Sequence, residues 1–210
     1  MKIAIINENS QASKNSIIVN SLKKVIKDND KIINIGMFNN DDKSLTYVEN
    51  GLMAAVLLNT GMADFIITGC GTGSGAMLAL NSFPGVFCGL ITDPLDAYLF
   101  SQINGGNAIS IPYAKGFGWG SELQLEYIFE KLFKDEFGGG YPIERKEPEQ
   151  RNAKILADIK NKTTRNMIDI LKDIDDEMVK QVFDRESFKN ILHTCNNSEI
   201  KEYLEQKINE

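Results

Sequence analysis

The chain has 210 residues, of which 42% are hydrophobic, and it carries a formal net charge of −6. This length and composition suit one domain with an extension or two small domains, while the acidic balance argues against nucleic acid or an anionic membrane as the main partner. No segment has the roughly 20 consecutive apolar residues of a membrane helix, and the N-terminal apolar run is too short for a signal peptide.

Five short apolar runs, separated by longer segments with helical spacing, occupy the first half of the chain. The runs are Ile3–Ile6, Lys31–Ile35, Asp64–Thr68, Val86–Thr92 and Ala108–Ile111. Runs that are apolar at successive positions are typical of strands buried on both faces. Their alternation with helical segments predicts a doubly wound α/β domain, in which helices cover a five-stranded parallel sheet.

The composition changes after the glycine-rich segment at residues 138–142. Beyond Gly140 the chain contains no glycine, and beyond Pro148 it contains no proline. The charged segments that follow have the spacing of amphipathic helices with one buried stripe. We therefore expect an α/β domain over residues 1–140. We expect a C-terminal helical extension over residues 141–210, with about four helices that pack on the core or on another subunit.

The three cysteines are Cys70, Cys88 and Cys195, and they form no Cys-x-x-Cys pair. An odd and widely spaced set is typical of a reduced protein without structural disulfides or a zinc site. We expect a cytoplasmic protein that binds no metal. A lone cysteine is most often a small buried hydrophobic residue, and this is the interpretation that we favour for Cys88 and Cys195.

Cys70 differs from the other two because it lies inside TGCGTGSG, residues 68–75, directly after the third predicted strand. In an open parallel sheet, ligands bind beyond the carboxyl ends of the strands. Glycine lets backbone N–H groups approach a ligand, and a helix beginning near Gly75 favours negative charge there, including a thiolate at Cys70. Such a thiolate can remove a proton from carbon while the N–H groups and the Thr72 hydroxyl hold the oxyanion.

A nucleotide site is an alternative interpretation of the same stretch. Gly71, Gly73 and Ala76 fit the pattern Gly-x-Gly-x-x-Ala of dinucleotide-binding turns. The pattern follows the third strand here, whereas it normally follows the first. A nucleotide-binding module without catalytic activity therefore stays open as the alternative.

Six motifs within residues 1–155 resemble those of a known family. They are MKIAI at the start, GMF after the second strand, CGTGSG, TDP, NGGN and FGGGYPIERKEPEQRNAKI. Together they resemble the ribose-5-phosphate isomerase B and galactose-6-phosphate isomerase family, whose members are aldose–ketose isomerases with a Rossmann-like three-layer αβα sandwich. The resemblance implies an isomerase without a cofactor, because the proton transfer is redox-neutral. It also implies a homodimer or higher homo-oligomer with sites between subunits.

The resemblance also implies roles for individual residues. In this family the cysteine of the CGTG motif moves a proton between two carbons through an enediolate. Cys70 is therefore expected to be the catalytic base. Thr72 and the amides of Gly71, Gly73 and Gly75 are expected to stabilise the enediolate.

This sequence departs from the pentose isomerases at the positions of two histidines. Those enzymes carry Asp-His after the first strand and a second histidine before the fifth, which helps to open the sugar ring. Here the corresponding residues are Glu8-Asn9 and Ile103, and the single histidine, His193, lies in the tail. Isoleucine cannot transfer a proton, so the resemblance does not extend to a cyclic substrate.

The departures are similar to a branch of the family, the 4-deoxy-L-threo-5-hexosulose-uronate ketol-isomerases, which act on open-chain uronates derived from glycosaminoglycans. GFGWGSEL and the helical tail also resemble this branch. We therefore expect Glu8, Asn9 and Asn104 to orient the substrate, and Arg145 or Arg151 to bind its carboxylate. A sugar-phosphate isomerase of the ribose-5-phosphate or galactose-6-phosphate type is the alternative within the family.

Overall fold

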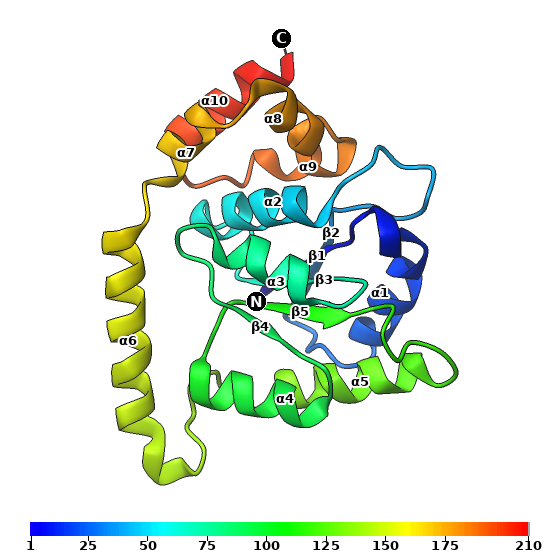
Figure 1. Ribbon diagram of the computed structural model, residues 1–210, viewed down its shortest axis with the longest axis vertical. Coiled ribbons are helices and arrows are strands. Elements are labelled where there is room, and N and C mark those ends of the chain that lie inside the picture. The colour runs from blue at the N-terminus through cyan, green and yellow to red at the C-terminus, as the bar shows by residue number, and fades with distance from the viewer. Residues whose placement is uncertain (210) are drawn as a thin grey trace.

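A five-stranded parallel sheet lies between two layers of helices in the computed structural model, which describes residues 1–209 (Figure 1). The strands are β1 (Lys2–Ile6), β2 (Lys31–Asn34), β3 (Phe65–Cys70), β4 (Cys88–Leu90) and β5 (Ala108–Pro112). Their order across the sheet is β2-β1-β3-β5-β4, and every neighbouring pair is parallel. The predicted three-layer α/β fold is confirmed.

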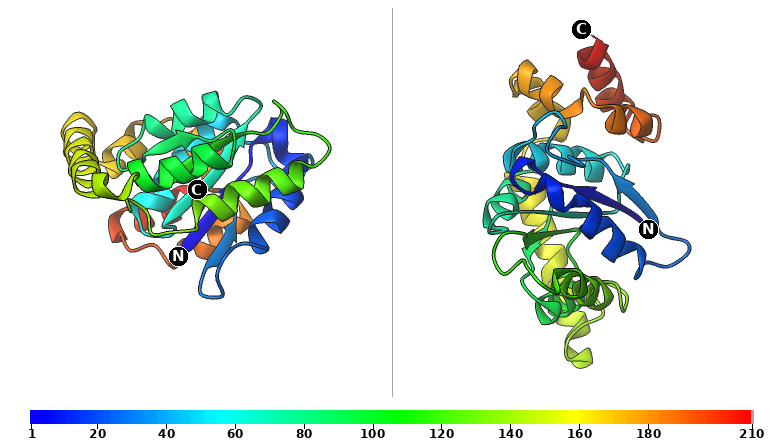
Figure 2. Two further views of the ribbon diagram at one scale, coloured as in Figure 1. Left: turned by 90° about the horizontal axis from the view of Figure 1, so that it is seen from below. Right: turned by 90° about the vertical axis from the view of Figure 1, so that its right-hand side faces the viewer.

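Helices cover both faces of the sheet (Figures 1 and 2). They are η1 (Asn9–Lys14), α1 (Asn15–Lys23), α2 (Tyr47–Asn59), α3 (Ser74–Asn81), α4 (Pro94–Leu99), η2 (Phe100–Asn104) and α5 (Ser121–Leu132). Ala4 and Ile6 of β1 pack in the core with α2 and α3, whereas Ile3 and Ile5 pack in the core with α1, α4 and α5. The two-residue period of a strand therefore explains why β1 is apolar at successive positions.

Strands β3 and β4 have different lengths from the predicted ones. β3 continues two residues beyond Thr68 and ends on Cys70, while β4 contains only three residues. The Asn81 side chain hydrogen-bonds both the N–H and the carbonyl of Cys88, at 3.0 and 2.8 Å, and the Asn107 side chain accepts from the N–H of Phe87 at 2.8 Å. At this edge of the sheet, asparagine side chains take the place of strand partners.

Over residues 141–209 the tail contains five α-helices, rather than the four that the sequence predicted. After a short turn, η3 (Ile143–Arg145), the helices are α6 (Lys146–Thr163), α7 (Met167–Asp173), α8 (Asp176–Phe183), α9 (Glu186–Leu192) and α10 (Ser198–Asn209). Helices α7–α10 share a hydrophobic core with α2 and lie on its outer side (Figures 1 and 2). Helix α6 stands beside the sheet, and none of its residues is buried.

The topological switch point of the sheet, where the crevice of a doubly wound fold is expected, lies between β1 and β3. The chain leaves β1 towards β2 and then crosses back to β3, so the connections of these two neighbouring strands run in opposite directions. Ligands of doubly wound folds bind at such a switch point, beyond the carboxyl ends of the strands. Ile6 pairs with Thr68, and two residues further along each chain segment lie Glu8 and Cys70. Both residues therefore lie at the same edge of the sheet.

Candidate active site

Cys70 is the last residue of β3, and its side chain is only 7% exposed. Its carbonyl accepts a hydrogen bond from the N–H of Tyr113 at 2.9 Å. The carbonyl of Gly71 accepts from the N–H groups of Ala114 at 3.0 Å and Lys115 at 3.2 Å. The segment that follows β5 therefore fixes the turn that carries the thiol.

Glycine is required at two positions of this turn. Gly73 has φ of +76°, and a Cβ there would lie 2.5 Å from the Leu90 side chain. A Cβ at Gly69 would lie 2.5 Å from the ring of Tyr113. The Ser110 hydroxyl donates to the Gly73 carbonyl at 2.6 Å. These contacts hold the backbone rigidly at the start of α3, as a preorganised oxyanion site requires.

The residues that the sequence predicted for proton transfer lie together on this turn. They are Cys70, Gly71, Thr72, Gly73 and Gly75. The Thr72 side chain is exposed, and Gly71 and Gly75 are partly exposed, so the turn borders solvent. The amino end of α3 adds its partial positive charge at this point. The arrangement can hold an anion next to a thiol.

Glu8 and Asn9 lie on the opposite side of the crevice, after β1. Glu8 is 2% exposed and caps η1: its carboxylate accepts from the Ser10 N–H at 2.8 Å and from the Ser10 hydroxyl at 2.6 Å. Asn9 is exposed, and its N–H donates to the Leu45 carbonyl at 2.7 Å. Its side-chain amide also donates to the Ser44 hydroxyl at 3.2 Å. Glu8 therefore shapes η1, whereas Asn9 connects the crevice with the loop before α2.

Two polar side chains of η1 that the sequence did not single out also reach the turn. The Gln11 amide nitrogen lies 3.9 Å from the position of a Cβ at Gly71. The Lys14 amine donates to the Gln11 amide oxygen at 2.7 Å and to the carbonyl of Tyr113, and it lies 4.5 Å from the centre of the Phe117 ring. Burial lowers the pKa of Lys14. This amine places a cationic group at the same edge of the sheet as Cys70.

Tyr47 is a third residue near the turn, and the sequence placed it in a helical segment but not at the site. Its ring lies 3.3 Å from the position of a Cβ at Gly75, and 43% of the residue is exposed. Thr46 and Glu49 form a capping box that fixes the start of α2. The Thr-x-x-Glu pattern is visible in the sequence and would have placed Tyr47 on the first turn of a helix after β2.

Asn104, Arg145 and Arg151 lie at the other end of the sheet. Asn104 ends η2, which precedes β5, whereas Cys70 pairs with the last residue of β5. That strand alone spans about 13 Å. Both arginines are exposed, on η3 and on α6, and α6 packs against η2. In Figure 1 the arrow of β5 points away from α6. A single chain does not bring these three residues together with Cys70.

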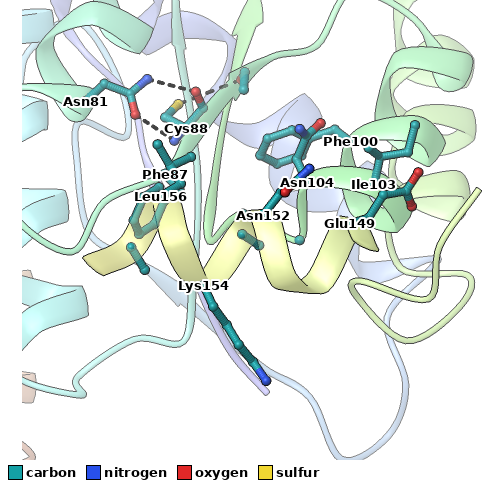
Figure 3. Close-up of a pocket in the computed structure, with 15 residues that line it drawn as sticks. Asn81, Phe87, Cys88, Phe100, Ile103, Asn104, Glu149, Asn152, Lys154 and Leu156 are labelled. Atoms are coloured by element: carbon teal, nitrogen blue, oxygen red, sulfur yellow. Dashed lines mark hydrogen bonds between the residues drawn. The ribbon is translucent and has the colours of Figure 1, made fainter. Parts of the chain in front are cut away.

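A groove of about 720 Å³ separates η2 and β4 from α6 (Figure 3). Asn104 lines it from the sheet side, and Asn152, Lys154 and Leu156 line it from α6. Cys88 also borders the groove, and burial raises the pKa of its thiol to about 12. The groove does not include Cys70, so it is a surface separate from the turn.

His193 and the remaining acidic side chains supply no further site. His193 follows α9 and is exposed, so the one imidazole belongs to the C-terminal helices. Within residues 1–209, no group of three or more His, Cys, Asp or Glu side chains is arranged to hold a metal ion. Over the same residues, no helix is both long and apolar enough to cross a membrane.

The chain is similar in sequence and in structure to known sugar isomerases. A family model described as ribose/galactose isomerase matches residues 3–147. A solved 4-deoxy-L-threo-5-hexosulose-uronate ketol-isomerase, complexed with a tartrate, is 56% identical over 100% of both chains, with a TM-score of 0.97. A ribose-5-phosphate isomerase from Vibrio parahaemolyticus is 45% identical over 99% of both chains, with a TM-score of 0.95.

More distant structures share the fold alone. The type B ribose 5-phosphate isomerase of Trypanosoma brucei is 20% identical, and the alignment covers 75% of this chain and 97% of that one, with a TM-score of 0.64. The comparison with curated proteins returned no match.

Proposed function

The chain belongs to the ribose/galactose isomerase family, and we propose that within this family of sugar isomerases it is a 4-deoxy-L-threo-5-hexosulose-uronate ketol-isomerase. It would act in the cytoplasm on uronates released from glycosaminoglycans. The observation that carries the proposal is a thiol, Cys70, on a glycine turn at the carboxyl edge of the sheet, with no imidazole beside it. The 56% identity to a uronate ketol-isomerase over the full length supports the same substrate class.

The proposed reaction moves a carbonyl by one carbon. The Cys70 thiolate removes the proton from the hydroxyl-bearing carbon next to the aldehyde, and the C–H electron pair forms the double bond of an enediolate. The N–H groups of Gly71 and Gly73 and the Thr72 hydroxyl hold its oxyanion. Cys70 then returns the proton to the former aldehyde carbon, while the hydroxyl oxygen passes its own proton to the former aldehyde oxygen and becomes the new carbonyl. No electrons leave the substrate, so the step consumes no cofactor.

An open-chain substrate fits Asn9 at the crevice and Ile103 on η2. The resemblance implies that ring-opening relatives carry histidines at these two positions, and neither an amide nor an alkyl side chain transfers protons at neutral pH. A substrate that already carries a free aldehyde does not need this step. Asn9 can instead donate or accept hydrogen bonds with substrate hydroxyls.

We further propose that a second copy of the chain completes the site. Asn104, Arg145 and Arg151 of one protomer would then lie over Cys70 of its partner, and one of the arginines would bind the carboxylate. Two features support this arrangement. The first is the separation of these residues from Cys70 within one chain. The second is the set of apolar residues that α6 exposes, which are Ile155, Leu156 and Ile159, each 51–55% exposed.

A ribose-5-phosphate isomerase is the second candidate function. It is favoured by the Vibrio parahaemolyticus structure, which matches 99% of this chain at 45% identity. In that case a group other than histidine would open the ring, and Arg145 or Arg151 would bind the phosphate.

The two candidates are separated by steady-state kinetics on both substrates. We expect kcat/KM for 4-deoxy-5-keto-uronate to exceed that for ribose 5-phosphate by about a hundredfold or more. A preference for ribose 5-phosphate would overturn the uronate assignment in favour of the second candidate. Turnover of neither substrate, together with a thermal shift on addition of nucleotides, would point to the nucleotide-binding alternative.

A further inference from the structure

We propose that Arg185, in the C-terminal helices, is a positioning residue for the active site. It fixes the β2–α2 loop, residues 35–46, and thereby places Asn9 and Tyr47 at the mouth of the crevice. This inference rests on the proposed function, because it assigns a role within the same site. The C-terminal helices would then position active-site residues in addition to covering α2.

Arg185 lies between α8 and α9 and is 8% exposed. Its Nη2 donates to the Ser44 carbonyl at 2.9 Å and to the Gln181 carbonyl at 3.4 Å. The side-chain amide of Gln181 also donates to the Ser44 carbonyl, at 2.5 Å. One carbonyl of the loop therefore accepts two hydrogen bonds from the C-terminal helices, which is the full capacity of its lone pairs.

Two further hydrogen bonds join the same helices to the loop. The Ser187 hydroxyl donates to the Ile35 carbonyl at 2.9 Å, at the start of the loop. The Lys43 amine donates to the Lys180 carbonyl at 3.2 Å, near its end. The loop is therefore held at both ends, and Arg185 is the most buried residue among those that donate these side-chain hydrogen bonds.

Burial of the Arg185 side chain carries an unfavourable desolvation free energy, because the guanidinium is charged. Burial lowers the pKa of its guanidinium, and the charges of Glu49, Asp42 and Asp184 oppose that effect. Within residues 1–209 its Nε has no hydrogen-bond partner. An apolar side chain of similar length would be buried here at a lower cost. The energetic cost of the guanidinium therefore indicates that its hydrogen bond to the loop serves a purpose other than stability.

The loop transmits this contact to both sides of the crevice. On one side, the Leu45 carbonyl and the Ser44 hydroxyl accept hydrogen bonds from Asn9, at 2.7 and 3.2 Å. On the other side, the loop leads into α2, where the Tyr47 ring packs against Gly75 of the catalytic turn. Only the Ser44 residue separates Arg185 from Asn9. A shift of the loop would therefore move groups that border the substrate without touching Cys70.

The test compares Arg185→Gln with Arg185→Lys and with Leu204→Ala. The glutamine variant removes the charge and shortens the side chain, whereas the lysine variant keeps a donor that can reach the Ser44 carbonyl. Leu204→Ala opens a cavity at a buried position of α10 and leaves Arg185 and Ser44 unchanged, so it controls for a general loss of stability. Each full-length variant is studied by urea unfolding, amide hydrogen exchange and steady-state kinetics.

We expect Arg185→Gln to accelerate amide exchange at Asn9 and in the β2–α2 loop by about tenfold. We expect it to raise KM about tenfold while kcat changes by less than about threefold, because the loop carries no proton-transferring group. Arg185→Lys should keep KM within about threefold of the wild type. Leu204→Ala should lower the unfolding midpoint but leave KM within about twofold.

The inference is overturned if Arg185→Gln leaves exchange in the loop unchanged, or if Leu204→Ala raises KM as much as Arg185→Gln does. The exchange measurement needs no substrate. If the wild type turned over neither sugar, the proposed function would fail, while unchanged or accelerated exchange would still decide whether Arg185 holds the loop.

Discussion

Cys70 and Pro112 are the last residues of β3 and β5, and they pair with each other in register. The residues that follow β5 therefore lie beside the thiol, and the residues that directly precede β5 lie at the opposite end of the sheet. Asn104 belongs to the second group, together with α6 and its arginine. This pairing divides the expected site residues into two sets, and the proposed second protomer would bring them together.

Mixed dimers test this division. Cys70→Ala and the double variant Arg145→Ala/Arg151→Ala should each be inactive alone. After the subunits are exchanged at equal concentration, about a quarter of the wild-type activity should return, because half of the dimers are mixed and each contains one intact site. Mixing without exchange is the control. If activity stays absent after exchange has been verified, the two sets do not combine across subunits.

The exposed apolar residues of α6 should form the contact between protomers. We expect the double variant Ile155→Asp/Ile159→Asp to sediment as a monomer and to lose activity, while its helical circular dichroism is retained. Lys154→Asp changes the charge of an exposed side chain on the same helix without removing an apolar residue, and should stay dimeric. A dimeric double variant would contradict the assignment of this interface.

Glycine substitutions separate the proposed catalytic role of the turn at residues 70–75 from ordinary backbone strain. Gly73 and Gly116 have similar φ angles, +76° and +73°, but only a Cβ at Gly73 meets other atoms, at 2.5 Å from Leu90. Gly116→Ala should lower the free energy of unfolding by about 1–2 kcal/mol, and Gly73→Ala by more. Activity should be lost only in Gly73→Ala. Equal losses of activity in the two variants would show that the turn is not specifically required.

The raised pKa of the buried Cys88 thiol predicts that the free energy of unfolding falls as the pH rises above about 9. Burial raises its pKa to about 12 from an unfolded value near 9. Above pH 9 the unfolded chain loses this proton first, so the folded state binds more protons. The free energy of unfolding should then fall by up to about 1.4 kcal/mol per pH unit. Urea unfolding between pH 8 and 10 should show a smaller slope in Cys88→Ala. Equal slopes would mean that the buried thiol does not titrate in this way.

The fold could be predicted because both faces of the central strands are buried. Ile3 and Ile5 face one helical layer and Ala4 and Ile6 face the other, which leaves a run of apolar residues in the sequence. The family resemblance seen in the motifs is confirmed by the family model over residues 3–147. The extent of β4 was not predictable, since its first residue, Cys88, and the preceding Phe87 are hydrogen-bonded by asparagine side chains.

The candidate site was predictable only in part. Its glycine turn is visible because backbone geometry demands glycine there. Lys14 and Gln11 reach the turn from a 3₁₀ helix, which leaves no periodic pattern in the sequence. Asn104 was expected near the substrate, but the position of η2 before β5 places it far from Cys70 within one chain. A single sequence contains no direct signal for the two-fold symmetry of the proposed dimer, which would bring Asn104 of one protomer close to Cys70 of the other.

The most direct test of the proposed reaction is proton NMR of the purified protein with 4-deoxy-5-keto-uronate in deuterated water. We predict that the wild type converts it to the 2,5-diketo isomer, with deuterium at the carbon that receives the proton. Cys70→Ala, with an unchanged unfolding midpoint, should be slower by at least about a thousandfold. Wild-type rates in the Cys70→Ala protein, or an inert uronate beside rapid conversion of ribose 5-phosphate, would contradict this assignment.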